Sequence, residues 1–368
     1  MIRCTRCLYP NTKPDLHVDS DGVCSACRAY DAALEIDWDQ RRKELELIID
    51  GREPNGSGYD CIVASSGGKD SHWQALTLIE MGLKPLLVTA STDYLTSLGR
   101  ANLDNLARHA TTIEVNTNRA ERARLCAMGL TQVGDVSWPE HASIFSTPFR
   151  VAAALGIDLI FYGESPQAAY GGPLGSAEAR RMTKRWITEF GGFLGLRPAD
   201  VADSGIDMRW YTLPDDAAME RIEAYFLGQF LPWDSRRNAT VAKAAGMAQF
   251  LPSPANWWHF ENVDNLMTSI HDFGMFLKYG YGRATAQLSV DIRHGWIERN
   301  DAAVIASQRD GTLWPSYAGV PLSKGLEWLG LSAGGLLSIF KHHANWDIIA
   351  EIVPADGGKI RAILRETA

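Results

Sequence analysis

The sequence predicts an α/β fold built on a doubly wound, mostly parallel sheet, and two observations support that prediction. Short apolar runs rich in β-branched residues alternate with helical stretches from about residue 59 to residue 200. The first run, 59–64, leads through the glycine pair at 67–68 into a helical stretch at 72–82. Alternating strands and helices favour parallel pairing, because each helix returns the chain to the starting edge of the sheet.

The expected elements follow in order along the chain. The runs predicted as strands are 59–64, 84–90, 111–115 and 158–162. The stretches predicted as helices are 39–50, 72–82, 102–109, 119–130, 215–226, 239–248 and 265–277. We expect four parts: a zinc-binding module at 1–30, a helix and linker at 31–58, the α/β domain at 59–200, and a mainly helical region for substrate or partner at 201–368.

Composition narrows the class of protein. The chain has 368 residues, a net charge of −8 and 46% hydrophobic residues, which is ordinary for a soluble globular protein. The acidic balance argues against broad contact with nucleic acid. No apolar run is long enough to span a bilayer, and Met1–Cys4 leads into a cysteine motif without the pattern of a signal peptide. We therefore expect a cytoplasmic protein without a membrane span.

Four of the six cysteines form two Cys-x2-Cys pairs with sixteen residues between them: Cys4, Cys7, Cys24 and Cys27. This spacing is typical of a two-knuckle zinc site, and four thiolate ligands favour a structural zinc. Partner docking or an iron–sulfur cluster is the remaining alternative, since a disulfide pair does not suit a cytosolic chain. We expect Cys61 and Cys126 to be small buried apolar residues.

Between the first strand and its helix lies Ser65–Ser71, whose residues suit an anion site. Two glycines allow the backbone to approach a phosphate, and the first amides of the helix point at the turn. Ser66 and Ser71 add hydroxyl donors, and Lys69 adds a positive charge. Asp70 makes sense beside a phosphate mainly when a cation lies between them, and Mg²⁺ is the usual one. A chance glycine turn at a helix start is the alternative.

Two other predicted strands also end in suggestive groups. Ser91–Asp93 follows the run at 84–90, and Gly163–Ser165 follows the run at 158–162. Ligands of parallel sheets bind at the carboxyl ends of the strands. We expect these two segments to lie beside the glycine turn.

The Walker spacing is absent, and the string Ser-Gly-Gly-Lys-Asp-Ser at 66–71 instead resembles the PP-loop of the ATP pyrophosphatases. In that family the loop holds the β,γ-pyrophosphate while the α-phosphorus is attacked. Further segments, in order along nearly the whole chain, are similar to the N-acetyl sugar amidotransferases. They are 4–10, 22–27, 162–167, 260–265, 270–274, 277–285 and 291–295.

This resemblance implies a sheet of the PP-loop (adenine nucleotide alpha hydrolase-like) type with an amino-terminal zinc ribbon. It also implies an ATP- and Mg²⁺-dependent enzyme of bacterial surface polysaccharide (lipopolysaccharide, O-antigen) biosynthesis. Such enzymes convert an acetamido group of a nucleotide-linked or free sugar into an acetamidino group, through an adenylated intermediate that ammonia attacks. The sequence contains no recognisable glutaminase nucleophile, so we expect a separate glutaminase partner to supply ammonia.

Under this interpretation the catalytic residues are Lys69, Asp70, Lys278 and Arg283. Lys69 neutralises the departing pyrophosphate, and Asp70 binds Mg²⁺. Lys278 and Arg283 close over the phosphates, although surface charges are the plain alternative for both. The nucleotide-binding residues are Ala64, Ser65, Ser66, Gly67, Gly68, Ser71, Ala90, Ser91, Gly163 and Glu164. The partner of Glu164, whether ribose, metal or substrate, stays open.

Two positions depart from the family pattern, which often has Asn where this chain has Ser165 and usually an acidic residue where it has Ala286. We expect His271 and His294 to be structural histidines bonded to backbone, and the aromatic cluster at 257–260 to be core. Two other functions remain open. One is a PP-loop tRNA thiolation enzyme, against which the acidic charge argues. The other is a non-catalytic zinc-ribbon scaffold with a degenerate nucleotide site, which Ala286 keeps open.

Overall fold

The computed structural model describes residues 1–53, 55–163, 171–172 and 180–365. Its centre is a parallel sheet of five strands in the order β3-β2-β1-β4-β5. The strands are β1 Cys61–Ala64, β2 Pro85–Ala90, β3 Thr112–Val115, β4 Leu159–Tyr162 and β5 Glu223–Phe226. Val63 of the central strand pairs with Leu87 on one side and Phe161 on the other.

The sheet is covered on both faces, as a doubly wound fold requires. Ile62 packs with Phe149 and Trp138 of α6 on one face, whereas Val63 packs with Trp73 and neighbouring residues of α3 on the other. Successive strand residues point to opposite faces, so an apolar run without polar interruptions is what a strand buried on both sides needs. The predicted α/β fold class is confirmed.

The helices of the described residues agree with most of the predicted stretches. They are α1 Ser25–Leu34, α2 Trp38–Asp50, α3 Lys69–Glu80, α4 Ser97–Leu106, α5 Arg119–Val133, α6 Trp138–Leu155, α8 Lys184–Phe190, α9 Asp216–Arg221, α10 Ser235–Ala244, α11 Thr268–Tyr279, α12 Arg283–Arg293, α13 Arg299–Arg309, α14 Leu322–Leu329 and α15 Ala333–His343. No described helix has both the length and the apolar character that a membrane span needs.

The helix predicted at 215–226 is wrong in its second half. The chain leaves α9 after Arg221 and enters β5, where Ala224 and Phe226 are buried and their neighbours are only partly buried. Pairing of β5 with β4 along 159–162 therefore outweighs the local helical pattern. This strand lies beyond residue 200, the boundary at which we ended the α/β domain, and the domain boundaries themselves stay predictions.

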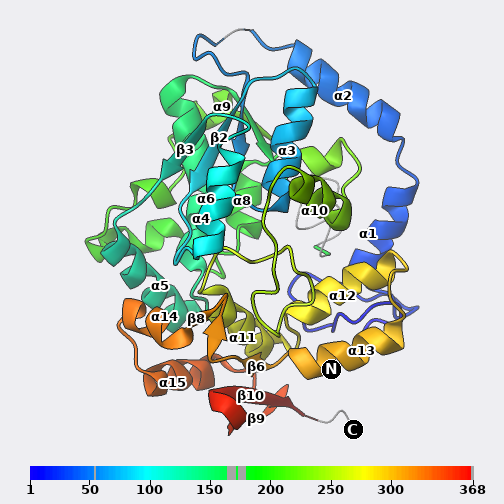
Figure 1. Cartoon of the computed structure of the whole chain (residues 1–368), viewed down its shortest axis with the longest axis vertical. Coiled ribbons are helices and arrows are strands. Elements are labelled where there is room, and N and C mark those ends of the chain that lie inside the picture. Colours follow the sequence, from blue (N-terminus) through cyan, green and yellow to red (C-terminus); the bar gives the residue numbers. More distant parts are fainter. Residues whose placement is uncertain (54, 164–170, 173–179, 366–368) are drawn as a thin grey trace.

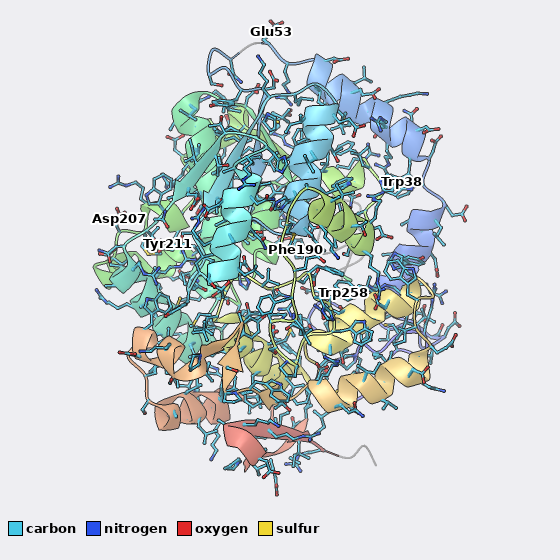
Figure 2. The ribbon with its side chains drawn as sticks, viewed as in Figure 1. Trp38, Glu53, Phe190, Asp207, Tyr211 and Trp258 are labelled. Atoms are coloured by element: carbon cyan, nitrogen blue, oxygen red, sulfur yellow. The ribbon has the colours of Figure 1, made fainter. Side chains whose placement is uncertain are left out.

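The carboxyl-terminal region is mainly helical, as predicted, and adds small antiparallel sheets. These are formed by β6 Thr312–Leu313, β9 Ile349–Ala355 and β10 Lys359–Leu364, and by the pair β7 Ser316–Tyr317 and β8 Val320–Pro321. Figure 1 shows α3 and α4 in the upper half of the molecule and α11 to α15 in the lower half. Trp258, labelled in Figure 2, lies between these halves, and its indole donates to Asp291 of α12.

The amino-terminal cysteine module lies against the carboxyl-terminal helices, although the two are far apart in sequence (Figure 1). The amide of Leu8 donates to the hydroxyl of Ser289 in α12, and Thr12 donates to the carbonyl of Tyr279. The guanidinium of Arg299 in α13 donates to the carbonyls of Cys4 and Cys7. The module is therefore held by several polar contacts to α11, α12 and α13.

Candidate active site

The glycine turn between β1 and α3 has the backbone that the sequence predicts for an anion site. Gly67 adopts a φ of +81°, which L side chains rarely adopt, and a Cβ there would lie 3.0 Å from the backbone nitrogen of Leu103. Gly68 is the N-cap of α3 with an ordinary extended backbone. The first amides of α3 therefore face the turn, where helix geometry leaves them without intrahelical partners.

Side-chain hydroxyls fix the shape of this turn. The hydroxyl of Ser71 accepts a hydrogen bond of 2.9 Å from the amide of Ser66, and Ser71 is only 4% exposed. The hydroxyls of Ser65 and Thr89 lie 2.9 Å apart and link the ends of β1 and β2. The hydroxyls of Ser65 and Ser71, which we assigned to nucleotide binding, therefore also form hydrogen bonds that stabilise the turn. The Ser71 proton remains available to an acceptor in front of the loop.

The ammonium of Lys69 lies between two carboxylates. It donates to Asp70 at 2.6 Å and to Glu261 at 2.8 Å, and the Lys69 side chain is 5% exposed. Asp70 also accepts from the amide of Asn238 in α10 at 3.0 Å. Three segments that are distant in the sequence thus converge on one charge cluster, which we call the Lys69 cluster: Lys69, Asp70 and Glu261.

Glu261 is the acidic member contributed by the carboxyl-terminal region. Burial alone would raise the pKa of its carboxyl, but the Lys69 ammonium lowers it below its ordinary value, with help from Arg283 and a hydrogen bond from Gln287. Glu261 is therefore ionised at neutral pH. With one cation and two anions, the Lys69 cluster carries a net charge of −1.

The other predicted nucleotide-binding positions lie at the same edge of the sheet as the turn. Ala64 ends β1, Ala90 ends β2 and is followed by Ser91, and Gly163 follows the end of β4. These strands are parallel neighbours, so their carboxyl ends meet at one edge. Gly163 is closely packed, since a Cβ there would meet Trp233 and Gln74 at 3.0 Å. The predictions for Glu164 and Ser165 fall outside the described residues.

Arg283 begins α12 and forms an ion pair with Asp272 of α11. Its guanidinium donates to both carboxylate oxygens of Asp272, at 2.5 and 3.1 Å. Burial alone would lower the pKa of Arg283, but Asp272 and, less strongly, Glu261 raise it above its ordinary value. Arg283 is therefore electrostatically connected to the Lys69 cluster through Glu261, and its predicted role over the phosphates stays a prediction.

Lys278 lies elsewhere, in a cavity whose described lining does not include Lys69. Its ammonium donates to the carbonyl of Val133 at 3.3 Å. The same cavity contains His271, whose Nδ1 bonds the buried carboxylate of Asp135 at 2.7 Å. The partner of His271 is thus a carboxylate and not the backbone that we expected, whereas His294 bonds the Val290 carbonyl as predicted.

The four predicted zinc ligands converge at the amino terminus and are fully buried. Cys4 and Cys27 sulfurs are 4.0 Å apart, those of Cys7 and Cys24 are 3.5 Å apart, and all four lie within 4.8 Å of one another. A tetrahedral zinc with bonds of about 2.3 Å places its sulfurs about 3.8 Å apart. The amides of Cys7 and Cys24 donate to the Cys4 sulfur, as suits a thiolate. The residues therefore fit a structural zinc ion.

Two further positions from the sequence are now located. Ala286 is 8% exposed and packs in the apolar cluster that surrounds the cysteine module, next to Tyr281. An acid at this position would lie in the apolar cluster that contains the four cysteines. Cys61 and Cys126 are fully buried in apolar clusters, as predicted.

Sequence reasoning missed Glu261 and Asn238 as members of the site. Glu261 lies in the segment 260–265, which we noted only for its resemblance, and Asn238 lies in a helical stretch with no distinguishing motif. Both reach Lys69 or Asp70 through tertiary packing across more than 160 residues. One sequence signal could have found Glu261. It lies in one of the segments that we noted for their resemblance to a family of nucleotide-using enzymes.

Comparisons with known proteins give limited matches. A segment of 110 residues is 28% identical to an uncharacterized protein of Methanocaldococcus jannaschii, and covers 29% of this chain and 39% of that protein. The chain thus spans well under half the length of this curated relative. A solved structure, NMN synthetase from Francisella tularensis, aligns with 58% of this chain and 95% of its own at 12% identity, with a TM-score of 0.28. The fold assignment above rests on the sheet itself.

Residues 249–349 match a family described as "LPS biosynthesis protein WbpG-like, C-terminal domain". This segment contains Glu261, Arg283 and Gln287. The carboxyl-terminal region is therefore similar to a domain of lipopolysaccharide biosynthesis proteins, and it is the region that contributes Glu261 to the Lys69 cluster at the end of the sheet.

Proposed function

We propose that this protein is an ATP-dependent amidotransferase that forms AMP and pyrophosphate while converting the acetamido group of an N-acetyl sugar into an acetamidino group. The single observation that carries this proposal is the placement of Lys69. It lies at the start of a helix, behind a turn with a positive φ, at the carboxyl edge of a parallel sheet. This is where such sheets bind the phosphates of a nucleotide.

The charge of the Lys69 cluster supports a role for Mg²⁺. A triphosphate that approaches a cluster with a charge of −1 is repelled unless a cation accompanies it. Asp70 and Glu261 offer the carboxylate oxygens that Mg²⁺ prefers, and Mg²⁺ characteristically takes one or two protein carboxylates and completes its shell with phosphates and water. These two residues would hold the ion, which would neutralise phosphate charge. Lys69, released from one carboxylate, would then contact the pyrophosphate.

The reaction needs an activated carbonyl, because an amide oxygen is a poor leaving group. The acetamido oxygen attacks the α-phosphorus, a new O–P bond forms, and the bond to pyrophosphate breaks. Ammonia then adds to the imidate carbon, and AMP leaves with the electrons of the C–O bond. The loop amides and Lys69 would stabilise the charge that develops on pyrophosphate.

The cysteines support an external source of ammonia. All six lie in the described residues: four form the predicted zinc site, and Cys61 and Cys126 are fully buried. Burial raises the pKa of both remaining thiols above the ordinary value, which makes them poor nucleophiles. We propose that a separate glutaminase supplies ammonia to this chain, and that free ammonium replaces it in the test tube.

The test is mass spectrometry of N-acetyl sugars, free and nucleotide-linked, after incubation with ATP, Mg²⁺ and ammonium. Exchange of O for NH lowers the product by about one mass unit. Sugar-dependent ATP–pyrophosphate exchange measures the first step alone. Lys69→Ala should reduce both signals by roughly a hundredfold or more, as loss of a transition-state contact does. The exposed Lys84→Ala is the matched control.

The two alternative functions, tRNA thiolation and a non-catalytic scaffold, predict different experimental results. Sugar-independent binding of tRNA that weakens steeply with salt would favour a thiolation enzyme. A folded, zinc-loaded protein without sugar-dependent exchange for any tested sugar would favour a scaffold. Either result would overturn the proposed activity.

A further inference from the structure

A cavity of about 270 Å³ lies where the amino-terminal module meets α6 and α11. The module contributes Lys13 to Asp15, the region around α6 contributes Asp135 and His141, and α11 contributes His271, Met275, Lys278 and Tyr279. The volume lies just under the roughly 300 Å³ at which sites for drug-sized ligands begin. It therefore suits a molecule the size of a monosaccharide better than a nucleotide.

Two lysines face this cavity without a carboxylate in ion-pair contact. The ammonium of Lys13 donates to the carbonyls of Pro14 and Gly171, at 3.2 and 3.0 Å, and that of Lys278 donates to the carbonyl of Val133. Within the described ranges, neither lysine has an acidic oxygen within 4.0 Å. Burial lowers the pKa of Lys13 to about 8 and lowers that of Lys278. Both charges are thus partly desolvated and only weakly compensated.

The remaining charged groups of the cavity do not neutralise these lysines. Asp135 is 4% exposed and accepts from His271 at 2.7 Å and from the amide of Ser137 at 2.9 Å. Burial alone would lower the pKa of His271, but Asp135 raises it above the ordinary value, and the bond between them engages the carboxylate with the His271 ring and not with a lysine. Asp15 is exposed to solvent at the rim, which weakens its attraction for Lys13.

We infer that this cavity binds the anionic group of a monosaccharide-sized ligand, a carboxylate or a phosphate, with Lys13 and Lys278 as its cationic contacts. An anion in the cavity would give these ammonium groups a charged partner in place of the carbonyl oxygens that they now contact. The apolar Met275 and Leu194 and the ring of Tyr279 supply surface for the uncharged part of the ligand. The inference does not depend on the reaction proposed above.

The test is isothermal titration calorimetry of the full, zinc-loaded chain with four probes: inorganic phosphate, glucuronate, glucose 1-phosphate and neutral glucose. We expect binding of at least one anionic sugar and none of glucose. Lys13→Gln and Lys278→Gln should each weaken that binding at least tenfold, which corresponds to about 1.4 kcal/mol. Lys278→Arg, which keeps the charge, should stay within a few-fold of the wild type, and Lys84→Gln should change nothing.

The outcomes separate the sources of the anion and decide the inference. Preference for glucuronate identifies a carboxylate, and preference for glucose 1-phosphate or phosphate identifies a phosphate group. Equal binding of glucose, no binding of any anion, or no effect of either glutamine variant would overturn the inference. A parallel loss of MgATP binding in the lysine variants would assign these lysines to the nucleotide and would overturn it as well. Zinc content and melting temperature confirm that each variant is folded.

Discussion

The protein holds lysines in two contrasting electrostatic settings. Lys69 is enclosed by the carboxylates of Asp70 and Glu261, so its site is negative before any ligand arrives. Lys13 and Lys278 contact carbonyl oxygens and form no ion pair with a carboxylate of the described residues. The first setting calls for a cation together with a polyphosphate, whereas the second calls for an anion alone. Under our two proposals, the same residue type serves two kinds of recognition, and its neighbours decide which.

The largest expected effect is the loss of stability on removal of Lys69. Lys69→Met leaves the carboxylates of Asp70 and Glu261 close together without their cation, and Glu261 is only 13% exposed. We expect the free energy of unfolding, measured with urea in the absence of ligands, to fall by about 3–5 kcal/mol.

A second variant separates this effect from the loss of packing. Lys69→Met combined with Glu261→Gln removes one uncompensated charge and should recover at least half of the lost free energy. A loss of less than about 1 kcal/mol in the single variant would mean that Lys69 is not held as an ion pair. That result would contradict the electrostatic setting that we describe for Lys69.

Removal of zinc should weaken ligand binding in the cavity of Lys13 and Lys278 much more than at the Lys69 cluster. Lys13 belongs to the loop between the cysteine pairs, so extraction of the metal with a strong chelator should weaken binding of the preferred anionic probe at least tenfold. Binding of MgATP at the turn between β1 and α3 should stay within about twofold. Metal content and circular dichroism provide the controls, and equal loss of both ligands would show that the module supports the whole molecule.

The sequence could predict the sheet because its strands carry their own signals. A strand that is buried on both faces needs a continuous apolar run, such as the one at 84–90. A turn with a positive φ needs a glycine, such as Gly67. Both patterns are local and can be read from the sequence. The strand β5 was missed because its buried residues, Ala224 and Phe226, alternate with partly buried ones, whereas β4 is buried along its whole length, and helix formers precede β5 in the sequence.

For the Lys69 cluster, only the residues of a single sequence segment were predicted. Lys69 and Asp70 are adjacent in the sequence, and so they could be named together with the glycine turn. Glu261 joins them from 192 residues away, and Asp135 joins His271 from 136 residues away. Such pairs depend on how α11 and α12 pack against the sheet, and no local periodicity encodes that arrangement.

Glu140 of α6, whose carboxyl oxygens accept from Thr92 and Asn265, predicts a pH dependence of stability. Burial, together with the nearby Asp93 and Asp264, raises the pKa of its carboxyl to about 8. The folded state therefore binds one more proton than the unfolded state between about pH 4.5 and pH 8. Stability consequently falls as pH rises through that window, and it levels off above it.

Glu140→Gln imitates the protonated carboxyl and should remove this dependence. Between pH 6 and pH 8 we expect the wild type to lose on the order of 2 kcal/mol more than the variant, as measured by urea unfolding. Thr92 and Asn265, which bond the two carboxyl oxygens, remain in place to accept and donate. Parallel pH profiles of the two proteins would contradict the raised pKa.

The smallest expected effect has the opposite sign to that of Lys69. Lys278→Met removes a partly desolvated ammonium that has no ion-pair partner among the described residues, so the ligand-free protein should keep its free energy of unfolding or gain up to about 1 kcal/mol. Because burial lowers the pKa of Lys278 in the folded state, the unfolded state binds more protons between that lowered pKa and the ordinary value of 10.5, and wild-type stability rises with pH through that window. The advantage of the variant should therefore be greatest near pH 7 and shrink as pH rises. A saturating anionic probe should reverse it, since the wild type gains more from binding than the variant does. A loss of more than 1 kcal/mol without ligand would place Lys278 in the same class as Lys69 and remove the contrast between the two sites.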